Sequence, residues 1–305
     1  MNKIKYFMIA TVLSLLISGC TSVKPDLGQV VFASPEEAVA ALCDAAGNND
    51  AKRLMEIFGS EGKDIVYSGD EKYDVESRAY FAKKAAEKTT LVKNEDLIYI
   101  NIGNDDWPFP VPVAIYGGKA FFYTAEGIDE VINRRIGRDE LNAIRVCRTI
   151  AGAEEEYARM KLAAGAVKEY TNKFFGDQNS KDGLYWDNKN KDTKEKSQIG
   201  ALVVLASQDV PIESRKPYYG YFYKILTAQG AAAPGGKKSY LVDGKMKKGF
   251  ALVAYPASYG ISGIKTFIVS RTGVVFEKDL GDDTSKLAAA MTEFNPDDTW
   301  EPVED

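Results

Sequence analysis

The first part of the chain repeats apolar residues with the period of a helix. Ser34, Pro35 and Glu37 have the order of a helix N-terminus, because serine caps the first turn, proline fits its first position and glutamate closes a capping box. Apolar residues then follow on one face, at Ala38, Leu42, Ala45 and Ala46. The pattern predicts this helix, a second over Ala51–Phe58 and a third over residues 73–89.

From residue 91 the apolar period changes to alternation, which is typical of strands. The predicted strands are residues 97–100, 111–116 and 120–123, and Gly117-Gly118 between the last two favours a hairpin. Helices followed by an antiparallel sheet are the pattern of an α+β domain. We place this N-terminal domain at residues 32–136.

The second half begins with an amphipathic stretch over residues 139–161, which predicts one long helix. Residues 166–175 predict a shorter helix before a loop rich in Asp, Asn, Lys and Gly. The rest is β in character, with predicted strands at residues 218–226, 250–255, 264–270 and 274–278. We therefore expect a second α+β domain at residues 137–305, in which one long helix packs on an antiparallel sheet.

The N-terminus has the pattern of an export signal. Two lysines precede an uncharged, mostly apolar run over residues 6–18, which is short for a spanning helix and fits a signal peptide. The motif Ile17-Ser18-Gly19-Cys20 resembles the bacterial lipobox, in which cleavage precedes an acylated cysteine. This predicts a signal peptide at residues 1–19 and a lipidated tether at residues 20–31. The alternative is an ordinary signal peptide in which Cys20 is incidental.

Lipidation of Cys20 predicts the location of the protein. Aspartate after the cysteine would favour retention in the inner membrane, and the residue there is Thr21. We therefore expect an exported protein anchored to the cell envelope, on the outer membrane facing the periplasm if the source is a diderm bacterium. The expected membrane partner is the lipid bilayer, to which acyl chains rather than charge would attach the protein.

Composition narrows the chemistry. The 305 residues include no histidine, which excludes Ser-His-Asp triads and His-rich zinc sites. Removing residues 1–19 takes away two lysines and changes the net charge from −5 to −7, which disfavours nucleic acid as a partner. Cys43 and Cys147, the two cysteines besides Cys20, lie on apolar helical stripes. They can pair, or they can serve as small buried apolar residues.

Five segments form a distinctive series, at residues 104–110 (NDDWPFP), 133–141 (NRRIGRDEL), 221–230 (YFYKILTAQG), 249–254 (GFALVA) and 266–269 (TFIV). This series resembles one uncharacterised bacterial envelope family, known as domain-of-unknown-function family twenty-nine fifty. The resemblance runs from residue 32 to residue 284. It implies an envelope protein and no specific activity.

The predicted long helix and the strands after it are also similar to the globular heads of type IV pilins and type II secretion pseudopilins. Residues 143–150 (AIRVCRTI) and 153–158 (AEEEYA) resemble the C-terminal half of the pilin helix. No apolar helix half precedes residue 139, so the resemblance implies a borrowed scaffold rather than a filament subunit. The N-terminal half loosely resembles the cone-shaped nuclear-transport-factor-like domains.

Three pairs of residues are candidates for binding, and each pair also has a structural interpretation. An acidic and aromatic pair can meet a sugar, or form a rigid turn before a strand. A pair of arginines can hold a carboxylate or phosphate, or form ion pairs with nearby acids. Two tyrosines on a strand can line an aromatic surface, or pack in the core. These pairs are Asp106 and Trp107, Arg134 and Arg135, and Tyr221 and Tyr223.

One loop offers oxygen ligands for a metal. Asp177, Asn179 and Asp182 are candidate ligands for calcium, which secretion pseudopilins of this shape can hold in a head loop. Lys181 does not fit the EF-hand pattern, and a solvated turn is the alternative interpretation. We expect no other cofactor.

Two functions remain open on the sequence. The first is a non-catalytic scaffold or binding and assembly module of the envelope, whose partner is another envelope protein or a glycan. The second is a hydrolase or binder that acts on peptidoglycan or another glycan through Asp, Glu and aromatic side chains. An enzyme of this kind requires two carboxylates in a concave aromatic pocket, one of them with a raised pKa.

Overall fold

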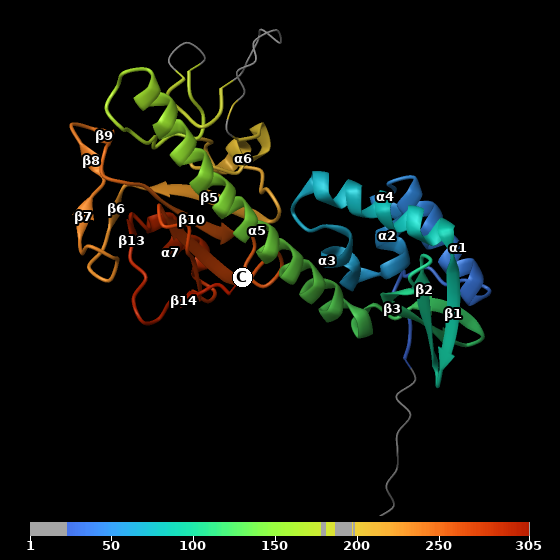
Figure 1. The fold of residues 1–305 in the computed structure, drawn as a ribbon. Coiled ribbons are helices and arrows are strands. Elements are labelled where there is room, and N and C mark those ends of the chain that lie inside the picture. The colour runs from blue at the N-terminus through green and yellow to red at the C-terminus, as the bar shows by residue number, and fades with distance from the viewer. Residues whose placement is uncertain (1–22, 178–180, 187–196, 198, 305) are drawn as a thin grey trace, which may run out of the picture.

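The computed structural model describes residues 23–177, 181–186, 197 and 199–304, and two halves joined by one long helix make up its fold (Figure 1). This helix, α5, spans Thr124–Ala163 and is about 60 Å long at 1.5 Å per residue. The fold is mixed α+β, as predicted. Within the described residues no helix combines the length and the apolar content needed to cross a bilayer. Residues 1–19, the predicted signal peptide, and Cys20 lie outside the described residues.

The N-terminal half contains helices and one antiparallel sheet. The helices are α1 Pro35–Gly47, α2 Ala51–Phe58, the 3-10 helix η1 Ser60–Gly62, α3 Lys63–Val66 and α4 Glu71–Glu87. The sheet has the order β1-β2-β3-β4, with β1 Thr89–Asn94, β2 Leu97–Ile102, β3 Trp107–Tyr116 and β4 Lys119–Phe122. The predicted helices and the hairpin between β3 and β4 are confirmed, because local caps and turn residues decide them.

The predicted start of α1 shows how local chemistry decides this half. The Ser34 hydroxyl accepts a hydrogen bond from the Glu37 amide at 3.2 Å, and the Glu37 carboxylate accepts one from the Ala33 amide at 3.0 Å. At the hairpin, Gly117 and Gly118 both have positive φ, which a side chain would oppose.

The C-terminal half is built on a second antiparallel sheet with the order β14-β12-β11-β10-β5. Its strands are β5 Tyr221–Leu226, β10 Ala251–Pro256, β11 Lys265–Ser270, β12 Val275–Asp279 and β14 Glu301–Pro302. Strand β10 lies between β5 and β11, with Val253 opposite Lys224 and Ile268. The four predicted strands are confirmed.

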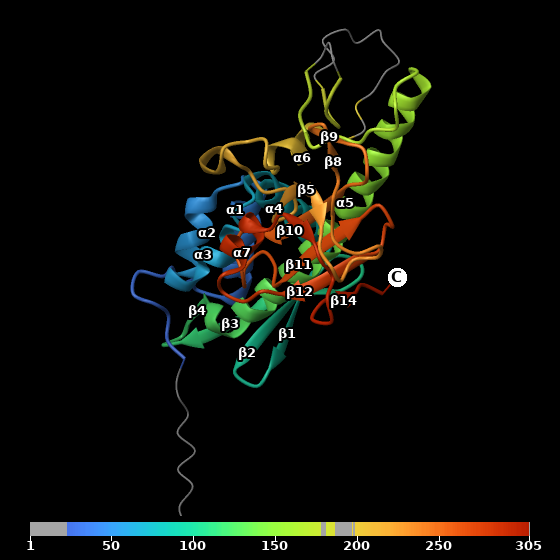
Figure 2. The same cartoon turned by 90° about the vertical axis from the view of Figure 1, so that its left-hand side faces the viewer.

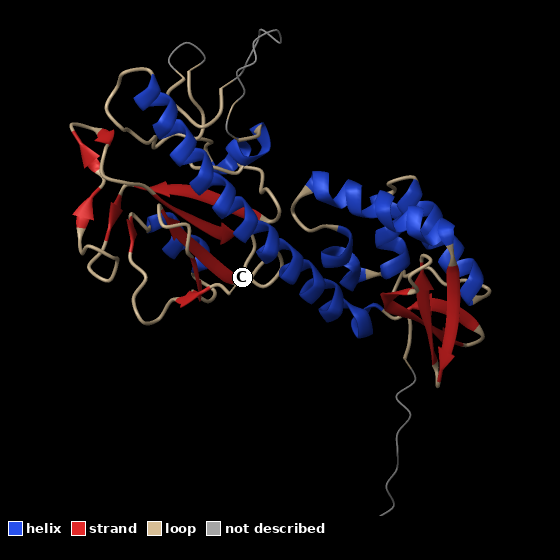
Figure 3. Ribbon diagram, in the orientation of Figure 1, coloured by secondary structure: helices blue, strands red, loops and turns tan. Residues whose placement is uncertain are grey.

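Shorter elements surround this sheet. They are α6 Ala201–Leu205, the 3-10 helix η2 Ile212–Ser214, α7 Thr284–Ala290, and the strands β6 Ala228–Gln229, β7 Lys238–Ser239, β8 Leu241–Val242, β9 Lys245–Met246 and β13 Glu293–Phe294. β13, β6 and β7 form one small sheet, and β8 and β9 form another. Figure 3 shows that the two main sheets lie toward opposite ends of α5.

Two predictions of helix extent are wrong. The long helix begins at Thr124 rather than at residue 139, because residues 124–138 combine two glycines with charged positions and so conceal the apolar period. Residues 166–175 are not helical. Their backbone pairs with distant segments instead, and the Tyr170 amide donates to the Met246 carbonyl at 2.8 Å. Burial of Tyr170 by this pairing outweighs its local helical pattern.

α5 contributes to two apolar cores in succession. Figure 2 shows the helix running from beside β3 past the strands of the C-terminal half. The first core includes residues up to Val131 and the second begins at Ala143, so position 136/137, where we placed the domain boundary, lies inside the helix. Cys43 packs against the first core, Cys147 lies in the second, and both are free thiols. The buried apolar role therefore accounts for both cysteines.

Gly127 marks the closest approach of α5 to the first sheet. A Cβ atom there would lie 2.6 Å from the Pro110 carbonyl oxygen of β3 and 2.7 Å from the Val111 Cα. Both are backbone atoms, which cannot rotate away. Gly137, further along the same helix, has no neighbouring atom within 4 Å of its Cβ position.

This pair of glycines predicts opposite effects of one substitution. Gly127→Ala should lower the free energy of unfolding by about 1–3 kcal/mol, because α5 must move off β3. Gly137→Ala should raise it by about 0.5–1 kcal/mol, because alanine favours the helix. Urea unfolding of both variants measures the difference, and equal stability of the two variants would contradict the close packing.

α5 also carries a carboxyl group in the second core. Glu154 is fully buried, one of its oxygens accepts the Thr171 amide at 3.0 Å, and the other has no partner among the described residues. Burial raises the pKa of Glu154 to about 8, although the hydrogen bond from Thr171 opposes this rise. The folded protein therefore holds a neutral carboxyl group here at neutral pH.

The raised pKa of Glu154 predicts a pH-dependent stability. Its stabilising effect is complete below its ordinary pKa of 4.5 and is lost as pH rises through about 8, because the unfolded chain releases the proton first. Glu154→Gln should therefore gain stability relative to wild type, by a few kcal/mol, from about pH 5 to about pH 9. Urea unfolding across this range measures the gain.

Glu155→Gln is the matched control. Burial of Glu155 is outweighed by hydrogen bonds from Tyr170 and Lys168, which lower its pKa. Its effect on stability changes only below its ordinary pKa of 4.5, so the offset from wild type should stay constant over the same range. A constant offset for Glu154→Gln as well would show that Glu154 is not held neutral.

Candidate ligand pocket

A pocket of about 650 Å³ lies in the N-terminal half, between α4, β3 and the first part of α5. Its volume is within the range of small-molecule sites in proteins. Most of the wall is apolar, and its inner part is lined by Leu42, Leu54, Phe58, Phe81, Ile102 and Phe109. These residues come from two helices before α4, from α4 itself and from two neighbouring strands, so only the folded domain brings them together.

Phe109 organises the aromatic part of this wall. It lies in β3 between two prolines, and its ring centroid is 5.1 Å from that of Phe81 and 6.4 Å from those of Phe58 and Phe122. Contacts of this kind add to the stability gained from burial. The cluster therefore fixes the apolar wall before any ligand arrives.

Charged side chains on the rim are held by specific partners. Arg134 donates to Glu130 at 2.6 Å and to the Pro108 carbonyl at 2.8 Å, and its guanidinium lies 4.9 Å from the centre of the Trp107 ring. Arg138, one turn further along α5, lies 3.8 Å from the centre of the Tyr73 ring. Stacking on aromatic faces fixes each guanidinium while leaving part of its edge free to donate.

Arg138 also donates to Asp139 at 3.0 Å. Burial raises the pKa of Asp139 to about 6, against the lowering effect of Arg138 and Arg135. Asp139 is therefore mostly ionised at neutral pH and remains a negative partner for this part of α5.

Arg135 is the most deeply buried charge of the pocket wall, with 5% of its surface exposed. Its Nη2 donates to the backbone carbonyls of Asp64 at 2.5 Å and Ile65 at 3.5 Å, whereas Nη1 has no hydrogen-bond partner among the described residues. Burial lowers the pKa of Arg135, and the carboxylates of Asp74 and Asp139 oppose this shift. The pocket wall thus contains a desolvated cation, Arg135, whose Nη1 is an unused hydrogen-bond donor among the described residues.

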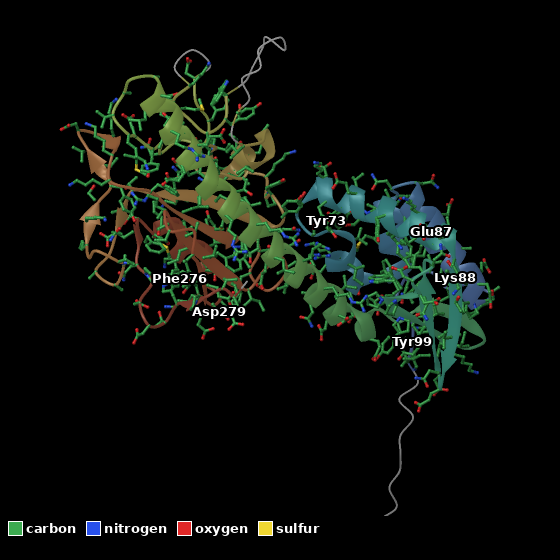
Figure 4. All side chains as sticks on the ribbon, in the orientation of Figure 1. Tyr73, Glu87, Lys88, Tyr99, Phe276 and Asp279 are labelled. Atoms are coloured by element: carbon green, nitrogen blue, oxygen red, sulfur yellow. The ribbon has the colours of Figure 1, made fainter. Side chains whose placement is uncertain are left out.

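The two residues of the acidic and aromatic pair, Asp106 and Trp107, lie in different surroundings. Trp107 lies at the pocket mouth and is 39% exposed. Asp106 lies in the preceding turn and forms an ion pair with Lys88 at 2.7 Å, and Figure 4 shows Lys88 at the sheet end of α4. The neighbouring Asp105 lines the pocket instead, where a hydrogen bond from Lys84 lowers its pKa. Of the six candidates, Trp107, Arg134 and Arg135 come together.

The two tyrosine candidates lie elsewhere. Tyr221 and Tyr223 are buried in the core of the C-terminal half, where Tyr221 donates to the Lys265 carbonyl at 2.9 Å and Tyr223 to the Tyr218 carbonyl at 3.2 Å. Burial raises the pKa of both phenols. Their packing role is what the structure shows, because both side chains point into the sheet core.

The calcium candidates are only partly described. Asn179 lies outside the described residues. The Asp182 carboxylate accepts hydrogen bonds from Lys173 and from the Asp177 amide, so donors already engage its oxygens. No group of three or more Cys, Asp or Glu side chains in the described part of the chain is arranged to hold a metal ion. Calcium binding stays a prediction.

Sequence reasoning missed the pocket residues of α4, among them Tyr73, Ser77 and Lys84. The helix has a weak apolar face, and nothing in its spacing shows that it meets β3 and α5.

Sequence reasoning also missed a second pocket, of about 630 Å³. It lies between the start of α4 and the segment before β5, where the rings of Tyr218 and Tyr219 are 4.4 Å apart. Figure 4 shows Tyr73 at this end of α4.

Comparison with known proteins gives one match. The family described as "Protein of unknown function (DUF2950)" matches the chain over residues 29–303. No curated protein and no solved structure matches. The resemblances to pilin heads and to nuclear-transport-factor-like cones therefore stay predictions.

Proposed function

We propose that this chain, which belongs to the DUF2950 family, is a non-catalytic binding protein of the cell envelope. One observation carries the proposal: an apolar pocket of about 650 Å³ whose rim of charged residues is fixed by partners. A volume of this size corresponds to about twenty molecules of bulk water. Replacing water with apolar ligand surface against such walls is favourable.

The charges of the rim suit binding better than proton transfer. Asp105 forms an ion pair with Lys84 at 3.0 Å, which lowers its pKa and keeps it ionised. A carboxylate that stays ionised can orient a ligand but cannot act as a general acid. Guanidinium groups act as permanent cations in proteins. The rim therefore supplies fixed charges.

Anchoring through an acylated Cys20 completes the proposed function. The described chain enters the N-terminal half beside β4, where the Phe32 amide donates to the Ala120 carbonyl at 2.8 Å. A lipid on Cys20 would therefore hold this half, with its pocket, close to the bilayer. The C-terminal half, with α5 lying along an antiparallel sheet as in a pilin head, would serve as the surface for another envelope component.

A second candidate function is the binding or hydrolysis of a glycan, and the second pocket favours it. Tyr218 and Tyr219 form an aromatic platform there, and burial raises the pKa of Asp70, helped by Asp74 and Glu76. However, the Asp70 carboxylate accepts the Tyr73 amide at 3.0 Å as the N-cap of α4. Helix capping accounts for this carboxylate, so we favour the first function.

Blocking the pocket should weaken binding of an uncharged apolar dye such as N-phenylnaphthylamine. Ser77 lines the pocket, and Ser77→Phe should weaken dye binding about tenfold or more, equivalent to about 1.4 kcal/mol. Ala79→Phe is the matched control, because Ala79 is exposed on the same helix and does not line the pocket. Fluorescence titration measures both, and equal dye affinity in the two variants would place the dye elsewhere.

Anchoring is tested separately. Cys20→Ala should lose incorporation of labelled fatty acid and move from the membrane fraction to the soluble fraction. Cys43→Ala should keep both properties, because Cys43 packs against the core of the N-terminal half. A Cys20→Ala chain that still fractionates with membranes would refute the lipid anchor.

A further inference from the structure

We propose that the pocket takes an amphiphile with an anionic head group, and that Arg135 selects the head group. The inference rests on the proposed binding function and names the chemistry of its ligand. Two observations support it. One is the apolar cavity, and the other is a buried guanidinium with a donor nitrogen that has no acceptor among the described residues.

The cations of the pocket differ in how their charge is balanced. Lys84 pairs with Asp105, Arg134 with Glu130 and Arg138 with Asp139. Arg78 and Arg135 instead donate to neutral oxygens, Arg78 to the Asn49 side chain and the Val66 carbonyl, and Arg135 to the carbonyls of Asp64 and Ile65.

Two carboxylates lie near Arg135 without accepting from it. Asp74 accepts hydrogen bonds from the amide and hydroxyl of Ser68, and Asp139 accepts from Arg138. Both stabilise the charge of Arg135 through space. They leave Nη1, which is itself shielded from solvent, without an acceptor among the described residues, and Arg135 lines the pocket, so a ligand oxygen that reaches Nη1 would meet both a positive charge and an unused donor.

The position of Arg135 matches a head group rather than a tail. Arg134, Arg135 and Arg138 lie within about one turn of α5, and so concentrate positive charge on the α5 wall. The wall supplied by α1, α2 and β3 is apolar and aromatic, whereas α4 contributes the rings of Tyr73, Tyr80 and Phe81 together with charged side chains. At the mouth, Trp107 and Tyr80 are 39% and 63% exposed, which leaves apolar rings for a chain to cross.

An unpartnered buried cation is costly for a protein to keep. Arg135 also ties α5 to α3 through its two carbonyl contacts, and this structural role needs only Nη2. Carboxylate and phosphate oxygens both accept from a guanidinium, so the shared chemistry is an oxyanion attached to an apolar chain. The unused Nη1 of Arg135 can donate to an oxygen of either head group.

The test compares ligands that differ only in the head group. The full-length Cys20→Ala chain, which carries no acyl group of its own at Cys20, is titrated with a long-chain carboxylate, the corresponding alkyl phosphate and the primary alcohol of equal length. Both anions should bind about tenfold or more tightly than the alcohol. Acetate and inorganic phosphate, each at millimolar concentration, should not displace the long-chain anions, because they lack the tail.

Variants then assign the preference to one residue. Arg135→Met should bind the alcohol as the parent chain does and lose the preference for the two anions. Arg135→Lys, which keeps the charge but not the fork, should retain part of that preference. Arg145→Met is the matched control, because Arg145 lies on α5, is exposed and does not line the pocket. Its preference for the anions should be unchanged.

Each outcome decides a separate claim. Equal affinity for anions and alcohol overturns the head-group inference and leaves the pocket function intact, whereas no binding of any amphiphile refutes both. An unchanged preference in Arg135→Met assigns the selection to another residue and overturns the role of Arg135. Displacement by acetate or inorganic phosphate shows a site for free anions instead. The parent-chain affinities decide the head-group claim even if Arg135→Met does not fold.

Discussion

The fold depends on one helix that must satisfy two cores in succession. α5 meets β3 so closely at Gly127 that no side chain fits between them, and further along it buries Ile150 and Tyr157 in the second core. Glu140, between these regions, accepts the amides of Ile264 and Lys265 at 2.9 Å and so ties α5 to the start of β11. A rigid helix with partners at both ends sets the spacing between the two sheets.

The same constraint creates the pocket. Because Gly127 holds the start of α5 against β3, the turns that follow place Arg134, Arg135 and Arg138 in the pocket wall. Stacking on Trp107 and Tyr73 fixes two of these arginines, and carbonyl contacts with α3 fix the third. The pocket is therefore a consequence of packing one helix on a sheet, with its charges placed before a ligand binds.

Periodicity predicted most elements because most are decided locally. The cap at Ser34, the glycine hairpin and the alternating strands each depend on a few neighbouring residues. The errors occur where distant contacts outweigh the local pattern. Residues 166–175 have a helical spacing, but Tyr170 pairs with Met246 and is buried there. The first part of α5 has glycines and charges, but packing on β3 keeps it helical.

The α+β class and the lack of histidine follow from the sequence alone, since each depends on composition or on near neighbours, and the sequence also predicts an export signal that ends before Cys20. It also singled out Trp107, Arg134 and Arg135 as residue types that bind. The folded structure was needed to show that these three share one pocket with α4, and that Tyr221 and Tyr223 belong to the core instead. A pocket is formed by walls that are distant along the chain, and local spacing carries no information about how those walls meet.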